Sequence, residues 1–286
     1  MSKNIYVNLR TETFSENINL LFPDWEQGNE RIAVFSPHDD DALIGAGYAM
    51  AAAMDEGAEV YVVVFCQGDC GYKNPDEKDS IVRIREKENL AALTSFDIPE
   101  KNIFRFEYPD FSTTQYMGYH LPNGELGSFP KIIEFIRKNK ITRLLMPNDY
   151  REHTDHTAVF NMAAFEVIQA GDPIVSDIGE GQKVKNMLQY SVWSDFSPHD
   201  MLVSNGKRLL RANRAIVCPK TVEDKVRNAI REYQSQDLII EDLFQTREER
   251  FTGTGYIELY IDFNPRPKLD YHPYVHGINE ILNSNK

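Results

Sequence analysis

The sequence predicts an α/β fold: a Rossmann-like, doubly wound and mostly parallel sheet with helices on both faces. Two observations lead to this prediction. Short apolar runs rich in β-branched residues alternate along the chain with longer segments of helical pattern, and this alternation is typical of βαβ units. The run EVYVVVF at residues 59–65 is also apolar almost throughout, as expected for a strand that is covered on both faces.

The elements of the first two thirds of the chain follow in a regular order. Residues 1–30 are polar apart from the short patch INLLF, and we interpret them as a lead-in segment. The strand RIAVFS at 31–36 precedes a helix at 42–58, which is rich in Ala and Met and ends near a glycine. The same alternation then predicts strands at 59–65, 102–108 and 141–147 and helices at 80–96, 128–140 and 154–171.

The last third of the chain is less regular. Strands are predicted at 187–193 and 214–219, and an amphipathic helix at 221–236. Residues 255–263, GYIELYIDF, alternate as in an edge strand. Because there is no internal repeat and no low-complexity linker, we expect one domain over residues 1–286, with 240–286 as a C-terminal extension packed on it.

Composition and charge exclude several classes of protein. The 286 residues carry a formal net charge of -13, which argues against a nucleic-acid partner. No apolar run approaches the ~18 residues of a membrane span, and the N-terminus contains nothing that resembles a signal peptide. Three cysteines are too few for a disulfide framework. The sequence therefore predicts a cytoplasmic protein with no membrane partner.

Polar residues gather after two of the predicted strands. PHDDDA at 37–42 follows the strand at 31–36, and HTDH at 153–156 follows the strand at 141–147. In open α/β sheets, ligands bind outside the carboxyl ends of the strands. Imidazoles and carboxylates are also ligands for zinc, and a bound cation would relieve the repulsion among three adjacent aspartates. A shared metal site is therefore predicted.

Each cluster also has a simpler structural interpretation. Aspartate side chains accept backbone N–H bonds in turns, and an acidic residue is favourable in the first turn of a helix. Either cluster alone is compatible with that role. Two such clusters at matching strand ends favour the metal site.

These motifs resemble those of the LmbE/PIG-L family of metal-dependent N-deacetylases and amidases. The family's first motif is Pro-His-Pro-Asp-Asp-Glu, and its second, His-x-Asp-His, matches HTDH. Its Arg-x-x-Glu-x-x-Ala pattern is similar to REKENLA at 85–91, while YPD at 108–110 and YQSQ at 233–236 are weaker matches. The resemblance spans roughly residues 31–240.

The resemblance implies a role for each matching residue. His38, Asp41 and His156 would hold Zn²⁺, although this ligand set also suits other divalent metals. Asp40 would be the general base that takes a proton from the attacking water.

The remaining matches imply groups that contact the substrate or the developing charge. A cationic His153 would stabilise the oxyanion, with Asp155 holding its ring. Arg85 would contact the substrate at the rim of the site, and Asp110 is a further candidate for substrate binding.

The first motif departs from the family pattern at two positions. Asp39 replaces the second proline, and Ala42 replaces the glutamate. We expect a looser turn without the proline, extra negative charge beside the metal, and the loss of a supporting carboxylate.

The function implied is a zinc-dependent hydrolase that removes an N-acyl group, with acetyl preferred, from an amino sugar or sugar conjugate. Its partner would be a small N-acylated sugar, and a homo-oligomer is compatible with the sequence. Three alternatives remain open: an amidase acting on a thiol-sugar conjugate, a metal-dependent phosphoesterase, and a non-catalytic carbohydrate-binding protein. A phosphoesterase would need a cationic side chain near the metal to hold the phosphate, and Arg151 is the clearest candidate in the motif loops.

Overall fold

The computed structural model describes residues 3–193, 196, 203–204, 209–264, 266 and 268–284. Most of the strands in this part of the chain belong to one sheet, and β8 and β9 form a separate pair. The strands are β1 (Ile5–Asn8), β2 (Thr13–Ser15), β3 (Arg31–Ser36), β4 (Glu59–Cys66), β5 (Ile103–Tyr108), β6 (Arg143–Pro147), β7 (Asn186–Tyr190), β8 (Val203–Ser204), β9 (Leu209–Leu210), β10 (Arg214–Cys218) and β11 (Tyr256–Phe263).

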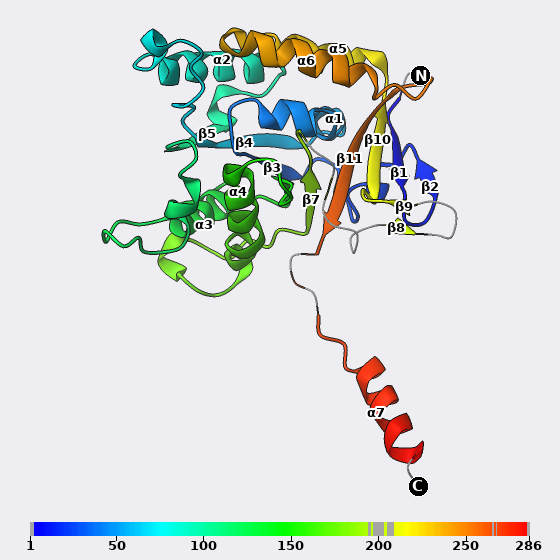
Figure 1. Cartoon of the computed structure of the whole chain (residues 1–286). Helices are drawn as coiled ribbons and strands as arrows, with labels where there is room; N and C mark the ends of the chain where they lie inside the picture. Colours follow the sequence, from blue (N-terminus) through cyan, green and yellow to red (C-terminus); the bar gives the residue numbers. More distant parts are fainter. Residues whose placement is uncertain are drawn as a thin grey trace.

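The large sheet is mixed. Its order is β2-β1-β10-β11-β7-β6-β3-β4-β5 (Figure 1). The neighbours from β7 through β6, β3 and β4 to β5 are parallel, whereas those from β7 through β11, β10 and β1 to β2 are antiparallel. The α/β class is therefore confirmed, but the sheet is less parallel than the sequence predicted.

The prediction that residues 255–263 form an edge strand is wrong. β11 lies inside the sheet, hydrogen-bonded to β10 on one side and to β7 on the other. Its alternation has another cause: Tyr256, Glu258 and Tyr260 are buried, while Leu259 on the opposite face is exposed. The alternation therefore arises because one face of β11 is covered and the other is open. Such a pattern occurs in internal strands as well as in edge strands.

Helices cover both faces of the parallel part. They are α1 (Asp41–Asp55), α2 (Ile81–Ser95), α3 (Ser128–Lys138), α4 (Thr154–Phe165), α5 (Lys220–Ile230) and α6 (Asp237–Glu248), while a further helix, α7 (His272–Ser284), covers neither face. In Figure 1, α1, α2, α5 and α6 lie on one side of the sheet, and α3 and α4 on the other. Alternate residues of β3 join the two cores: Ile32 and Val34 face the first, Ala33 and Phe35 the second.

The two ends of the chain differ from expectation. The lead-in segment supplies two strands, β1 and β2. The expected C-terminal extension over 240–286 is not one packed unit: β11 is internal to the sheet, whereas no residue of α7 is buried. In Figure 1, α7 stands apart from the sheet, since the chain after β11 leads away from both cores. Among the described residues, no helix has the length and apolar character needed to cross a membrane.

Two connections place the polar clusters at the same edge of the sheet. β3 and β6 are adjacent and parallel, with Ile32 opposite Arg143. β3 ends at Ser36 just before α1, and β6 ends at Pro147 just before α4. Because the carboxyl ends of parallel neighbours lie at one edge, the two loops face each other there.

Candidate metal centre

Three of the predicted ligands converge between these loops. One ligand atom each from His38, Asp41 and His156 lies within 4.8 Å of the other two. Oδ2 of Asp41 is 3.2 Å from Nδ1 of His38 and 3.1 Å from Nε2 of His156. A carboxylate oxygen therefore sits between two imidazoles, although residues 38 and 156 are far apart in sequence.

The state of the His156 ring indicates that the cluster fits a cation. Nε2 of His156 is buried and has no hydrogen-bond partner of acceptable geometry among the described residues. Buried polar nitrogens are rarely left unpaired. Although burial opposes protonation, the Asp41 and Glu152 carboxylates raise the pKa of His156 to about 9. This surplus of negative charge attracts a cation, and two imidazoles with a carboxylate suit zinc.

Glu152 completes the surroundings of His156, and the sequence analysis did not single it out. Its Oε2 lies 2.9 Å from Nδ1 of His156. Its Oε1 accepts the Ser191 hydroxyl at 2.8 Å and the N–H groups of Val192 and Trp193 at 2.8 and 3.0 Å. A carboxylate on the far nitrogen orients a ligating histidine. The signal in the sequence was the spacing of four residues between Glu152 and His156 in REHTDH. This spacing indicates a contact between the two side chains only once the start of the helix is known.

His153 and Asp155 lie beside this cluster. Nδ1 of His153 accepts the N–H of Asp155 at 3.2 Å, so the ring caps α4. The Asp155 carboxylate accepts the N–H groups of Phe111 and Thr113 and lies 3.4 Å from Nε2 of His38. The Asp155 carboxylate therefore ties the loop after β5 to the start of α4.

The prediction of a cationic His153 needs correction. Burial and the neighbouring His38 lower the pKa of His153 below its usual value, so the ring is neutral near pH 7. Because Nδ1 accepts a backbone N–H, the proton of the neutral ring belongs on Nε2. His153 is thus a neutral N–H donor.

Asp39 does not place its charge beside the cluster, contrary to expectation. The side chain is fully buried and pairs with Nε of Arg85 at 3.2 Å and with the guanidinium of Arg105. Its backbone carbonyl accepts Asn89 Nδ2 at 2.6 Å and the Tyr233 hydroxyl at 2.7 Å. The additional carboxylate is therefore neutralised behind the turn.

Arg85 lies behind the site, which corrects its predicted place at the rim. It is 4% exposed and sits between Asp39 and Asp40, with its Nη2 atom 3.6 Å from Oδ1 of Asp40. Burial raises the pKa of Asp40, and Arg85 opposes that shift. Arg85 therefore orients Asp40, and its guanidinium is committed to carboxylates of the protein itself.

Asp110 anchors the loop that follows β4. It is 9% exposed and accepts the N–H groups of Gly68 and Cys70 at 2.9 and 3.0 Å. One oxygen lies within 4.8 Å of ligand atoms of His38 and Cys66, so Asp110 borders the cluster. Burial raises the pKa of Cys66 to about 11, which leaves a neutral thiol and weakens it as a metal ligand.

The turn between β3 and α1 is held without the family's proline. The Ser36 hydroxyl donates to the carbonyl of His38 at 2.5 Å and accepts the N–H of Ala42 at 3.0 Å. The N–H of His38 donates to Oδ2 of Asp41 at 2.8 Å. These three hydrogen bonds fix the conformation of the turn, which the family's proline would otherwise restrict.

Sequence comparison finds one family. Residues 33–167 match the family model described as PIG-L: GlcNAc-PI de-N-acetylase. The matched range contains both polar clusters, Arg85, Asp110 and Glu152. No curated protein sequence matches the chain.

Solved structures share the fold at low sequence identity. N,N'-diacetylchitobiose deacetylase from Pyrococcus horikoshii is 21% identical, with a TM-score of 0.61 over 87% of this chain and 90% of that chain. A conserved protein from Thermus thermophilus is 22% identical, with a TM-score of 0.59 over 84% and 97%. GalB, the 4-carboxy-2-hydroxymuconate hydratase from Pseudomonas putida, is 16% identical, with a TM-score of 0.58 over 84% and 99%. A deacetylase and a hydratase on one fold mean that the site must decide the chemistry.

Proposed function

Because residues 33–167 are a PIG-L family domain, we propose that this protein is a metal-dependent hydrolase that removes an N-acetyl group from an amino sugar or a sugar conjugate. The observation that carries the proposal is the convergence of His38, Asp41 and His156 on one point. The strand order adds support, since the cluster lies where the chain winds outward from β3 through β4 and from β6 through β7. In a doubly wound sheet this switch point is where ligands bind.

The three converging side chains are the proposed holders of the metal, and zinc is the ion that their chemistry suits best. When bound, the metal polarises the acyl oxygen and lowers the pKa of water. Glu152 keeps the His156 ring in place.

The other polar groups supply proton transfer and charge stabilisation. Asp40 takes the proton of the attacking water and passes it to the leaving nitrogen, while Arg85 keeps its carboxylate oriented. The Nε2–H of His153 donates to the acyl oxygen as negative charge develops there, a contribution of roughly 3–4 kcal/mol in comparable sites.

Loss of the proposed base tests this function. Wild-type protein loaded with zinc should release acetate from N-acetylglucosamine derivatives, and Asp40→Asn should lower the rate by ~10²–10⁴-fold while retaining metal. Asp97→Asn, on the exposed connection after α2, is the matched control and should behave as wild type. An Asp40→Asn protein with full activity would exclude the mechanism.

A substrate panel separates the remaining alternatives. Cleavage of a thiol-sugar amide in preference to N-acetylglucosamine derivatives would indicate the amidase. Phosphate release without acetate release would indicate the phosphoesterase, and sugar binding without any product would indicate a carbohydrate-binding protein.

A further inference from the structure

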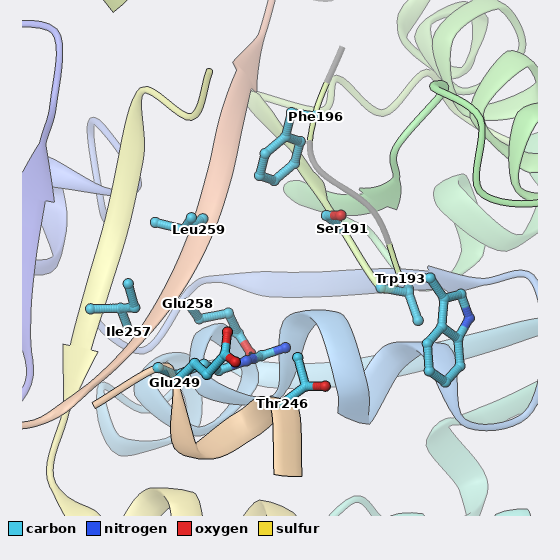
Figure 2. Close-up of a pocket in the computed structure, with 10 residues that line it drawn as sticks. Ser191, Trp193, Phe196, Thr246, Glu249, Ile257, Glu258 and Leu259 are labelled. Atoms are coloured by element: carbon cyan, nitrogen blue, oxygen red, sulfur yellow. The ribbon is translucent and has the colours of Figure 1, made fainter. Parts of the chain in front are cut away.

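A cavity of about 290 Å³ opens beside the candidate metal centre, between β11, α6 and the segment after β7. Its size is at the low end for ligand sites. Figure 2 shows Thr246, Glu249 and Glu258 gathered between β11 and Trp193.

Glu152 joins this cavity to the metal centre. One of its carboxylate oxygens contacts His156, and the other accepts N–H groups from Val192 and Trp193, which line the cavity. A single buried carboxylate thus separates the cavity wall from a proposed metal ligand.

The polar part of the cavity combines a buried carboxylate, Glu258, with the guanidinium of Arg250. Glu258 is 3% exposed, and its Oε1 accepts the N–H groups of Tyr48 and Ala49 at 2.9 and 3.1 Å. Its Oε2 is buried without a hydrogen-bond partner among the described residues, and Nη1 of Arg250 lies 4.0 Å away. Arg250 is partly exposed on the cavity wall, so its guanidinium can donate to a ligand hydroxyl.

The other residues that line the cavity restrict the charge and polarity of the ligand. Trp193 is 49% exposed and supplies an aromatic surface to the cavity. Glu249 disfavours an anion, while Arg250 disfavours a cation. A neutral ring with hydroxyls on its edge and apolar C–H faces satisfies all of these groups.

We propose that this cavity binds a neutral sugar unit of the substrate, adjacent to the unit that carries the N-acetyl group. The inference rests on the proposed function, because it names the part of the substrate that extends away from the metal centre. A sugar bound in this cavity would make the enzyme prefer sugar conjugates to monosaccharides.

The test fills the cavity from an exposed position on α6. Thr246→Phe places an aromatic ring in the cavity, whereas Gln245→Phe places the same ring on the neighbouring exposed residue, which does not line it. The first readout is the ratio of kcat/KM for N,N'-diacetylchitobiose to that for N-acetylglucosamine. Wild type and Gln245→Phe should share one ratio, and Thr246→Phe should lower it roughly tenfold.

The second readout is binding, measured without turnover. The chain has two tryptophans, so Trp25→Phe leaves Trp193 as the sole fluorescent reporter. Titration of this variant with N,N'-diacetylchitobiose should change the Trp193 emission. Adding Thr246→Phe should abolish the response, and adding Gln245→Phe should preserve it.

The outcomes separate this inference from the proposed function. If acetate is released but Thr246→Phe matches Gln245→Phe in both readouts, the cavity inference is overturned and the proposed function survives. If wild type hydrolyses no N-acetylated sugar, the proposed function fails and the fluorescence titration decides alone. A response abolished by Thr246→Phe then supports the cavity, and no response in any variant overturns it.

Discussion

Three adjacent aspartates act differently because each side chain leaves the turn in its own direction. Asp39 points back to Arg85 and Arg105, Asp40 lies against Arg85, and Asp41 lies between two imidazoles. Mutual repulsion is therefore balanced by cationic or protonatable partners, of which Arg85 is shared by Asp39 and Asp40. The sequence could not assign the partners of Asp39, since Arg85 and Arg105 are 46 and 66 residues away along the chain.

Neutralising Asp39 should destabilise the fold. Asp39→Asn leaves the Arg105 guanidinium without its carboxylate and leaves Arg85 with Asp40 alone, and breaking a buried ion pair in this way costs ~3–5 kcal/mol. Urea denaturation measures the change. The double variant Asp39→Asn/Arg105→Gln should lose less than the sum of the two single changes, because one stranded charge is removed. An Asp39→Asn protein as stable as wild type would contradict this account.

Replacing Glu152 should weaken the metal centre without removing a ligand. Glu152→Gln keeps the shape but loses the charge that orients and polarises His156, so metal affinity should fall ~10–100-fold. Competition with a chromophoric chelator measures it. Ser191→Ala is the control, because it removes a contact of the other carboxylate oxygen and should change affinity less. Equal affinities for Glu152→Gln and wild type would refute this role.

Among the elements, α1 determines the position of the aspartates through one close approach. A Cβ atom at Gly45 would lie 2.3 Å from Cδ2 of Tyr190 and 2.9 Å from the carbonyl oxygen of Ser191. Tyr190 cannot easily move, because it is fully buried and its hydroxyl donates to the carbonyl of Phe35 at 2.6 Å. Near its start, four residues after Asp41, α1 therefore packs directly on the end of β7.

Adding a methyl group at this contact should be costly. We expect Gly45→Ala to lower the free energy of unfolding by ~1–3 kcal/mol through overpacking and to reduce metal affinity, since α1 must shift. Gly277→Ala is the matched control: that helical glycine in α7 has nothing within 4 Å of an added Cβ, and alanine favours a helix there. Thermal unfolding of both variants tests the contrast, which fails if Gly45→Ala is neutral.

At the scale of the molecule, the parallel half could be predicted and the antiparallel half could not. Residues 31–36 and 59–65 are local apolar runs separated by a helix, so pattern alone indicates parallel neighbours. β1 instead pairs with β10, placing Ile5 opposite Val217, and no local pattern encodes a pairing over that separation. The site divides in the same way: His38 and His156 could be predicted from strand ends, whereas the burial of Arg85 depends on packing.

Glu258 should make the folded protein less stable as pH rises from 4.5 to 8. Burial raises the pKa of Glu258 to about 7 against an ordinary value of 4.5, despite the opposing charge of Arg250. Between these values the folded state keeps a proton that the unfolded state has released. The stabilising contribution is therefore complete below pH 4.5 and is lost as pH rises through about 7, which amounts to about 3 kcal/mol.

Glu258→Gln isolates this contribution, because other titrating groups are shared by both proteins. Urea denaturation of wild type and variant at pH 4.5 and pH 8 gives a difference in stability at each pH. From the lower to the higher pH, wild type should lose about 3 kcal/mol relative to the variant. Glu241→Gln, on the exposed face of α6, should change that difference little. A Glu258→Gln difference that is the same at both pH values would mean that Glu258 is already ionised in the folded protein at pH 4.5, and that burial alone does not govern its proton.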